Sequence, residues 1–249
     1  MSENYAVWKL SLYDAVVLLA GSAAGGMAVG WLFYDSVKLG MTAALILLIF
    51  MKPRYIRWQI SRRQQELLLQ FRDLLYSVAS SVSVGRSMGQ ALEESLEFWK
   101  GTYSEKDLIM QETAGMVRRM KETGERDVEV LKDFAQRSGL QDVYDFVMVY
   151  ENCRGSGANL VQAVDRAAAI IGDKIALEKE LHSLMAQKQF EGRIIMVSPF
   201  VLMLFLKISS PGFLAPLTGS MEGYLVSSLA LGLILVAILM MERVNRVDI

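Results

Sequence analysis

The stretch YLVSSLALGLILVAILMM, residues 224–241, holds eighteen consecutive residues without a charge. A helix of that length extends about 27 Å at 1.5 Å per residue, close to the ~30 Å hydrocarbon core of a bilayer. Lipid offers no hydrogen-bond partners, so a crossing segment bonds its backbone groups internally as a helix. The stretch therefore predicts a membrane span in an all-α fold.

Three further apolar stretches predict spans at 15–33, 37–51 and 194–210. The second is the shortest, with only thirteen consecutive uncharged residues, 39–51. The third contains Pro199, which membrane helices tolerate, and Lys207, which lies near one end and could extend its ammonium group to the membrane surface. With the span at 224–241, these make an N-terminal hairpin over 1–51 and a C-terminal hairpin with its tail over 194–249.

The positions of the basic residues predict the orientation of the spans, because Lys and Arg favour the cytoplasmic side. The segment 52–63 is rich in such residues and contains no acid, and the loop 211–223 contains no Lys or Arg. We therefore expect a multi-pass protein of the cell membrane with a basic cytoplasmic linker at 52–63 and both termini in the cytoplasm. The cytoplasmic basic residues are Lys52, Arg54, Arg57, Arg62, Arg63, Arg243 and Arg246.

Between the hairpins, residues 64–193 form a charged, proline-free stretch with 16 basic and 21 acidic side chains. Apolar residues recur there at helical spacing on one face. They are Leu67, Phe71, Leu74, Leu75, Val78 and Val82. Glycines stand where the apolar runs stop, as helix C-terminal caps do: Gly85, Gly101, Gly124, Gly139, Gly155 and Gly157.

This pattern predicts a cytoplasmic six-helix bundle between the two hairpins. The last helix should continue almost without a break into the third span. The six helices are expected at 57–83, 87–99, 104–123, 127–138, 141–154 and 159–190.

A weak internal repeat relates GRSMGQAL, residues 85–92, to GANLVQAV, residues 157–164. In each copy a glycine ends one helix, and Ser87 or Asn159 two residues later can cap the next. Gly85, Ser87, Gly157 and Asn159 are therefore predicted structural turns, although two unrelated turns would give the same pattern.

Composition excludes several classes of function. The 26 basic and 27 acidic residues nearly cancel, so no nucleic-acid partner is expected. One cysteine, Cys153, and one histidine, His182, cannot form an internal disulfide or a Cys/His zinc site. No segment has the spacing of a phosphate-binding P-loop. We expect no catalytic residue, no metal site and no cofactor, and hence no enzyme.

The segment 118–127 is dense in both charge signs around a glycine turn. Such a corner could dock a protein partner by complementary potential, or it could be an ordinary solvated corner. The candidate partner-contact residues are Arg118, Arg119, Lys121, Glu125, Arg126 and Asp127.

The segments 74–92 and 155–164, the second followed by a long charged helix and a span carrying Pro199, resemble the type II secretion F-domain family. These GspF/PilC-like proteins are the inner-membrane platforms of secretion systems and type IV pili. The resemblance covers about residues 64–208. The flanking hairpins resemble the Tad (tight adherence) pilus branch, whose TadB and TadC proteins carry one such domain each.

The resemblance implies a non-enzymatic platform that couples a cytoplasmic secretion ATPase to the assembly of pilin subunits in the membrane. A single copy of the domain implies a paralogous platform protein or a second copy of this chain as partner, alongside membrane lipids. Two other classes remain open: a membrane-anchored signalling or regulatory protein without a pilus partner, and a small transporter. A transporter would place ionisable residues inside its spans, where only Asp14 and Lys207 come close.

Overall fold

The computed structural model describes residue 5, residues 10–156 and residues 159–244. Over these residues the chain is all-helical, without a strand and with one isolated bridge between Lys100 and Tyr103. The expected turn residue Gly157 and the tail residue Arg246 lie outside the described residues. The all-α class expected from the sequence is confirmed for the described chain.

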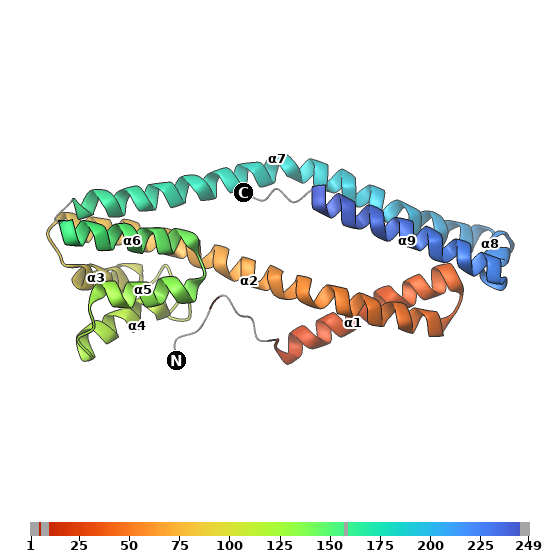
Figure 1. The fold of residues 1–249 in the computed structure, drawn as a ribbon, viewed down its shortest axis with the longest axis horizontal. Helices are drawn as coiled ribbons and strands as arrows, with labels where there is room; N and C mark the ends of the chain where they lie inside the picture. Colours follow the sequence, from red (N-terminus) through yellow and green to blue (C-terminus); the bar gives the residue numbers. More distant parts are fainter. Residues whose placement is uncertain (1–4, 6–9, 157–158, 245–249) are drawn as a thin grey trace. The chain divides into compact units, whose positions relative to one another are not determined.

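The helices follow one another in the order seen in Figure 1. A π-helix, η1, extends the first α-helix by one turn. The elements are α1 Leu12–Val29, η1 Gly30–Tyr34, α2 Val37–Ser83, α3 Met88–Trp99, α4 Leu108–Glu122, α5 Asp127–Ser138, α6 Gln141–Ser156, α7 Leu160–Ser209, α8 Pro211–Gly219 and α9 Met221–Val244.

Among the described residues, four helical stretches are long and apolar enough to cross a membrane. Each contains or overlaps one of the four stretches picked out in the sequence. They are Leu12–Tyr34, Val37–Ser83, Leu160–Ser209 and Met221–Met240. By length and composition, the described residues thus contain four candidate spans, at the places that the sequence predicted.

Helix α2 is longer than the sequence suggested. The basic linker 52–63, of which residues 57–63 already belong to the predicted helix 57–83, lies entirely inside α2, Pro53 included. The segment contains no glycine to end a helix. Proline removes one backbone hydrogen bond but need not end a helix, particularly close to a membrane span. The expected continuity of the last bundle helix with the third span is confirmed, because α7 runs unbroken through Pro199.

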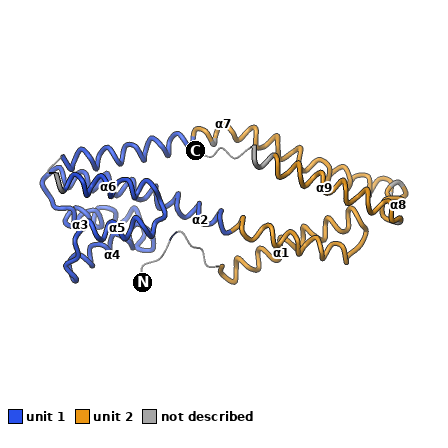
Figure 2. The backbone as a smooth tube through the Cα atoms, viewed as in Figure 1, with its two compact units in different colours: residues 1–9, 56–179 blue, residues 10–55, 180–249 orange. Residues whose placement is uncertain are grey.

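The chain divides into two compact units, which Figure 2 shows in different colours. Unit 1 holds residues 1–9 and 56–179, and unit 2 holds residues 10–55 and 180–249. Both boundaries fall within helices, one in α2 and one in α7.

Unit 1 is built around an apolar core to which α2, α3, α4, α5, α6 and α7 all contribute. The six residues of the predicted α2 stripe, from Leu67 to Val82, are each at most 8% exposed. Phe71 lies at the centre, with its ring 5.8 Å from that of Phe134 and 5.6 Å from that of Phe146. Burying a side chain of this size contributes about 1.5–3 kcal/mol.

The corner between α2 and α3 has the geometry that the repeat predicted. Gly85 ends α2 with φ of +87°, and the Ser87 hydroxyl accepts a hydrogen bond from the Gln90 backbone N–H at 3.4 Å. The Gln90 side-chain oxygen in turn accepts from the Ser87 N–H at 3.1 Å, which completes a capping box. At the start of α7, the Asn159 side chain accepts from the Gln162 N–H at 3.3 Å. By contrast, Gly155 lies inside α6 rather than ending it.

In unit 2, small residues allow α1 and α2 to approach closely. A Cβ atom on Gly26 would lie 2.3 Å from the Ala44 Cα, and one on Gly30 would lie 2.2 Å from the Gly40 Cα. A Cβ on Gly21 would meet nothing within 4 Å. The Gly26/Gly30 face therefore packs within this hairpin, as small residues do between membrane helices.

Replacing Gly85 with alanine should lower the stability of the protein by about 1–2 kcal/mol, because a Cβ disfavours positive φ. A Cβ there would meet no atom within 4 Å, so the loss would come from the backbone alone. Gly115 lies inside α4 with similar free space, and Gly115→Ala should raise stability by up to about 1 kcal/mol. Thermal unfolding of the full chain in detergent measures both, and equal shifts of one sign would contradict the assignment.

Candidate functional site

The charged corner, residues 118–127, joins the end of α4 to the start of α5 in unit 1. Its centre is Arg119, whose Nε and Nη2 donate to the Glu125 Oε2 at 3.0 and 2.6 Å. Its Nη1 donates to the Asp133 Oδ2 at 2.6 Å. This fork of charge-assisted hydrogen bonds fixes the turn that contains Glu125 against both helices.

The other candidate charges of the corner also have partners within unit 1, with one exception. Lys121 pairs with Glu93 of α3 at 2.5 Å, and Arg126 pairs with Glu129 at 2.5 Å. Asp127 accepts hydrogen bonds from the Tyr150 hydroxyl at 2.6 Å and from Arg154.

Arg118 is exposed, and no ion pair joins it to any described residue. Exposed ion pairs contribute only about 0–1 kcal/mol each, so the pairs elsewhere in the corner orient side chains more than they stabilise the fold. The structure thus brings the six predicted residues to one corner, but it leaves Arg118 as the charge most available to a partner.

Ion pairs with arginine lower the pKa of two carboxylic acids at or beside the corner, Glu125 and Asp133. Hydrogen bonds from Arg119 lower the pKa of Glu125. At Asp133, burial raises the pKa, but hydrogen bonds from Arg119 and Arg137 outweigh it and the net shift is downward. The lowered pKa values keep Glu125 and Asp133 ionised at neutral pH, so both remain charged partners of Arg119.

Next to the charged corner, Glu112 and Arg137 form a largely buried ion pair that the sequence did not predict. Arg137 donates from Nη1 and Nη2 to the two oxygens of Glu112, at 2.7 and 2.8 Å, and their side chains are 13% and 10% exposed. The Tyr5 hydroxyl also donates to Glu112, at 2.8 Å, and the Arg63 guanidinium lies 4.6 Å from the Tyr5 ring centre. Burial, followed by the bond to Glu112, raises the pKa of Tyr5.

A signal for this pair is present in the sequence. Glu112 occurs on α4 among buried apolar neighbours such as Ile109 and Met116, so a helical projection places a carboxylate on the core face. No spacing rule, however, relates it to Arg137 on another helix.

Unit 2 contains a second polar cluster, the hairpin junction, formed by Trp31, Tyr34, Asp35, Lys207, Tyr224 and Ser228. The Lys207 ammonium donates to the Asp35 Oδ1 at 2.9 Å and to the Trp31 carbonyl, and it lies 4.4 Å from the Trp31 ring centre.

In the same cluster the Tyr34 and Ser228 hydroxyls are 2.8 Å apart, and the Tyr34 ring stacks on Tyr224. Lys207 was predicted to extend toward the membrane surface. In the structure its side chain is only 17% exposed, and its contacts join the two hairpins.

An apolar groove of about 460 Å³ runs beside the hairpin junction, lined from α1, η1, α2 and α7. Trp31, Leu47 and Phe200 are among its lining residues, all of them apolar.

Asp14, the acid near the start of the first span, is buried and accepts hydrogen bonds from the Tyr55 hydroxyl at 2.8 Å and from the Ser11 N–H at 3.0 Å. It thus caps α1.

No group of three or more His, Cys, Asp or Glu side chains that could hold a metal ion occurs among the described residues. A scan against protein-family models finds none that matches the chain, and searches of curated proteins and of solved structures find no similar one.

Replacing Arg137 with methionine should lower the stability of the protein by about 3–5 kcal/mol, because Glu112 would keep its buried charge without its main partner. The matched control is Arg126→Met, which removes an exposed ion pair and should cost at most about 1 kcal/mol. Thermal unfolding of the full chain in detergent compares the two. Equal losses of stability would contradict the claim that the Glu112–Arg137 pair stabilises the fold more than an exposed ion pair does.

Proposed function

We propose that this chain is an inner-membrane platform protein of a Tad/type IV-like pilus or of a type II secretion system. In this role it couples a cytoplasmic secretion ATPase to the assembly of pilin subunits. The proposal starts from the resemblance of residues 64–208 to the F-domain family.

One observation supports it most directly. Helices α2 and α7 each contain a candidate membrane span and, in another part of the same helix, core residues of unit 1. In α2 these core residues begin at Leu67, and in α7 they are Val164, Ala168 and Ile171. A force applied to the helical core of unit 1 would thus reach the spans along covalently continuous helices.

The charge distribution supports a cytoplasmic position for unit 1. Lys52, Arg54 and Arg57 lie exposed on α2 directly after its apolar part. Basic residues next to a span favour the cytoplasmic side, and the cytoplasm is where a secretion ATPase is found. On this topology unit 1 is a cytoplasmic six-helix bundle, and both termini of the chain are cytoplasmic.

The charged corner offers the ATPase a contact in which Arg118 carries an exposed positive charge. Charges at the rim of an interface mainly set specificity and association rate. The spans of unit 2 would meet the pilin helices and lipids. A paralogue or a second copy would supply the second domain that the resemblance implies.

The proposal predicts that tagged full-length protein, solubilised from its native membranes in detergent, captures a secretion ATPase and a TadB/TadC-like paralogue. Arg118→Glu should reduce capture of the ATPase several-fold and leave capture of the paralogue unchanged, because it reverses one exposed charge. Mass spectrometry of the bound proteins measures both.

The matched control is Lys106→Glu, which reverses an exposed charge in the loop before α4, away from the charged corner. It should leave capture of the ATPase unchanged. If the folded wild-type protein recovers neither partner, the platform assignment fails and a signalling or regulatory role replaces it. Equal losses with both variants would reject the corner as the contact.

A further inference from the structure

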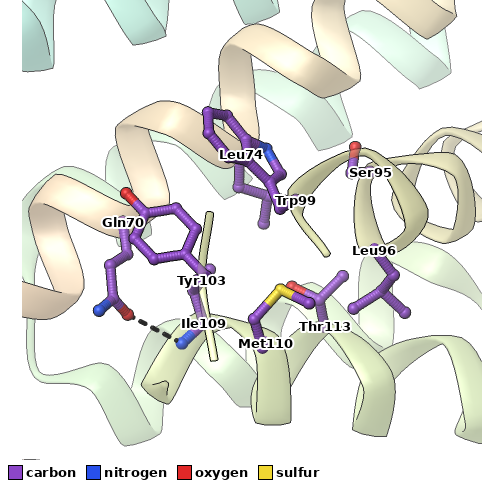
Figure 3. A pocket seen from close by; sticks show the side chains of 9 residues that line it. All are labelled: Gln70, Leu74, Ser95, Leu96, Trp99, Tyr103, Ile109, Met110 and Thr113. Atoms are coloured by element: carbon purple, nitrogen blue, oxygen red, sulfur yellow. Dashed lines mark hydrogen bonds between the residues drawn. The ribbon is translucent and has the colours of Figure 1, made fainter. Parts of the chain in front are cut away.

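The apolar groove beside the hairpin junction has room for part of an organic molecule. Its volume of about 460 Å³ lies within the range of small-molecule sites, about 300–1,000 Å³. A second hollow, inside unit 1, is lined from α2, α3, α4 and the loop between α3 and α4, as Figure 3 shows, and offers only about 10 Å³. The groove of unit 2 is therefore the hollow that can hold a ligand larger than water.

The walls of the groove suit hydrocarbon. Gly25 and Ala28 of α1 line it together with the larger Leu47 of α2 and Phe200 and Leu204 of α7. All of these residues lie in helices that are long and apolar enough to cross a membrane. In a bilayer an unfilled hollow between such helices would forfeit dispersion contacts along its walls. The groove is thus matched to an acyl chain of the surrounding lipid.

A pair of opposite charges lies at one end of the groove. Phe200, Leu204 and Lys207 recur at i, i+4 and i+7 on one face of α7, which places Lys207 about one turn beyond the lining. Its ammonium lies 4.4 Å from the ring centre of Trp31, itself a lining residue, and 2.9 Å from the Asp35 Oδ1. A phospholipid has this same pattern, with charges at one end and hydrocarbon beyond. A membrane-spanning helix of a protein partner is apolar along its length.

The two charges also indicate the kind of headgroup. An ammonium has three N–H groups, and the hydrogen bonds from Lys207 to Asp35 and to the Trp31 carbonyl use two of them. The Asp35 side chain is 59% exposed and, among the described residues, forms an ion pair with Lys207 alone. A headgroup with both a phosphate and an ammonium complements both charges. An anionic lipid would instead bring an unmatched negative charge beside the Asp35 carboxylate.

We propose that the groove binds one zwitterionic phospholipid that carries an ammonium headgroup, as phosphatidylethanolamine does. One acyl chain fills the groove, the phosphate accepts a hydrogen bond from Lys207, and the headgroup ammonium pairs with Asp35. The lipid thereby joins the first hairpin to α7 in unit 2, whichever partners the chain has elsewhere.

Native mass spectrometry of the delipidated full-length protein in detergent tests the headgroup. Phosphatidylethanolamine and phosphatidylglycerol with identical acyl chains are titrated separately, and bound lipids are counted per chain. The first phosphatidylethanolamine should bind with a Kd about fivefold lower than that of the first phosphatidylglycerol. Equal affinities, or tighter binding of phosphatidylglycerol, would overturn the proposal.

A pair of variants tests the groove. Ala28 and Ala24 are both exposed on α1, but only Ala28 is among the lining residues. Ala28→Phe should fill part of the groove and raise the Kd for phosphatidylethanolamine about fivefold, whereas Ala24→Phe should leave it unchanged. Equal effects of the two variants would overturn the proposal. Loss of a bound second copy of the chain in Ala28→Phe, with lipid binding intact, would overturn it in favour of a protein helix.

A second pair of variants tests the charges and does not depend on the packing of the groove. Asp35 has φ of +49°, which asparagine also tolerates, so Asp35→Asn removes the negative charge with little change to the backbone. Lys207 would then be unopposed, and the preference should reverse toward phosphatidylglycerol. The matched control Glu222→Gln removes an exposed acid at the start of α9 and should keep the original preference. An unchanged preference in Asp35→Asn would contradict the proposed headgroup contacts.

Discussion

Backbone hydrogen bonding in an apolar medium is the constraint on which this structure depends. Four stretches of the chain are apolar enough to enter a bilayer, and a helix lets each bond its N–H and C=O groups internally. The same constraint accounts for helices that run through Pro53 and Pro199. It also explains the close packing of Gly26 on Ala44, because van der Waals contact replaces the hydrophobic effect between helices in lipid.

Local rules predicted most of the helices and part of the turn chemistry. Apolar spacing identified the buried face of α2, and the pairing of glycine with Ser87 identified the corner before α3. The helical state of residues 52–56 was missed because a basic segment that starts near a proline was interpreted as a linker, whereas residues 57–63 already belonged to the predicted helix 57–83. The π-helix before Asp35 and the short α8 were also missed, since both depend on packing within unit 2.

The charges could be counted in the sequence but not paired. Glu112 and Arg137 are 25 residues apart, and Asp35 and Lys207 are 172 apart, so no local spacing relates them. Once paired, most charges of the corner at 118–127 are committed to unit 1 rather than to a partner. The sequence thus located the candidate site, but only the fold separates Arg118 from the charges that hold α4 and α5 together.

The proposed topology has unit 1 in the cytoplasm and the segment between the third and fourth candidate spans outside the cell. Cys153 is the single cysteine, so Cys153→Ala gives a background for Lys106→Cys in unit 1 and Met221→Cys at the start of α9, both at exposed positions. In intact spheroplasts a membrane-impermeant maleimide should label the Met221→Cys variant alone, and after lysis it should label both. Labelling of the Lys106→Cys variant before lysis would contradict the cytoplasmic position of unit 1 and, with it, the platform role.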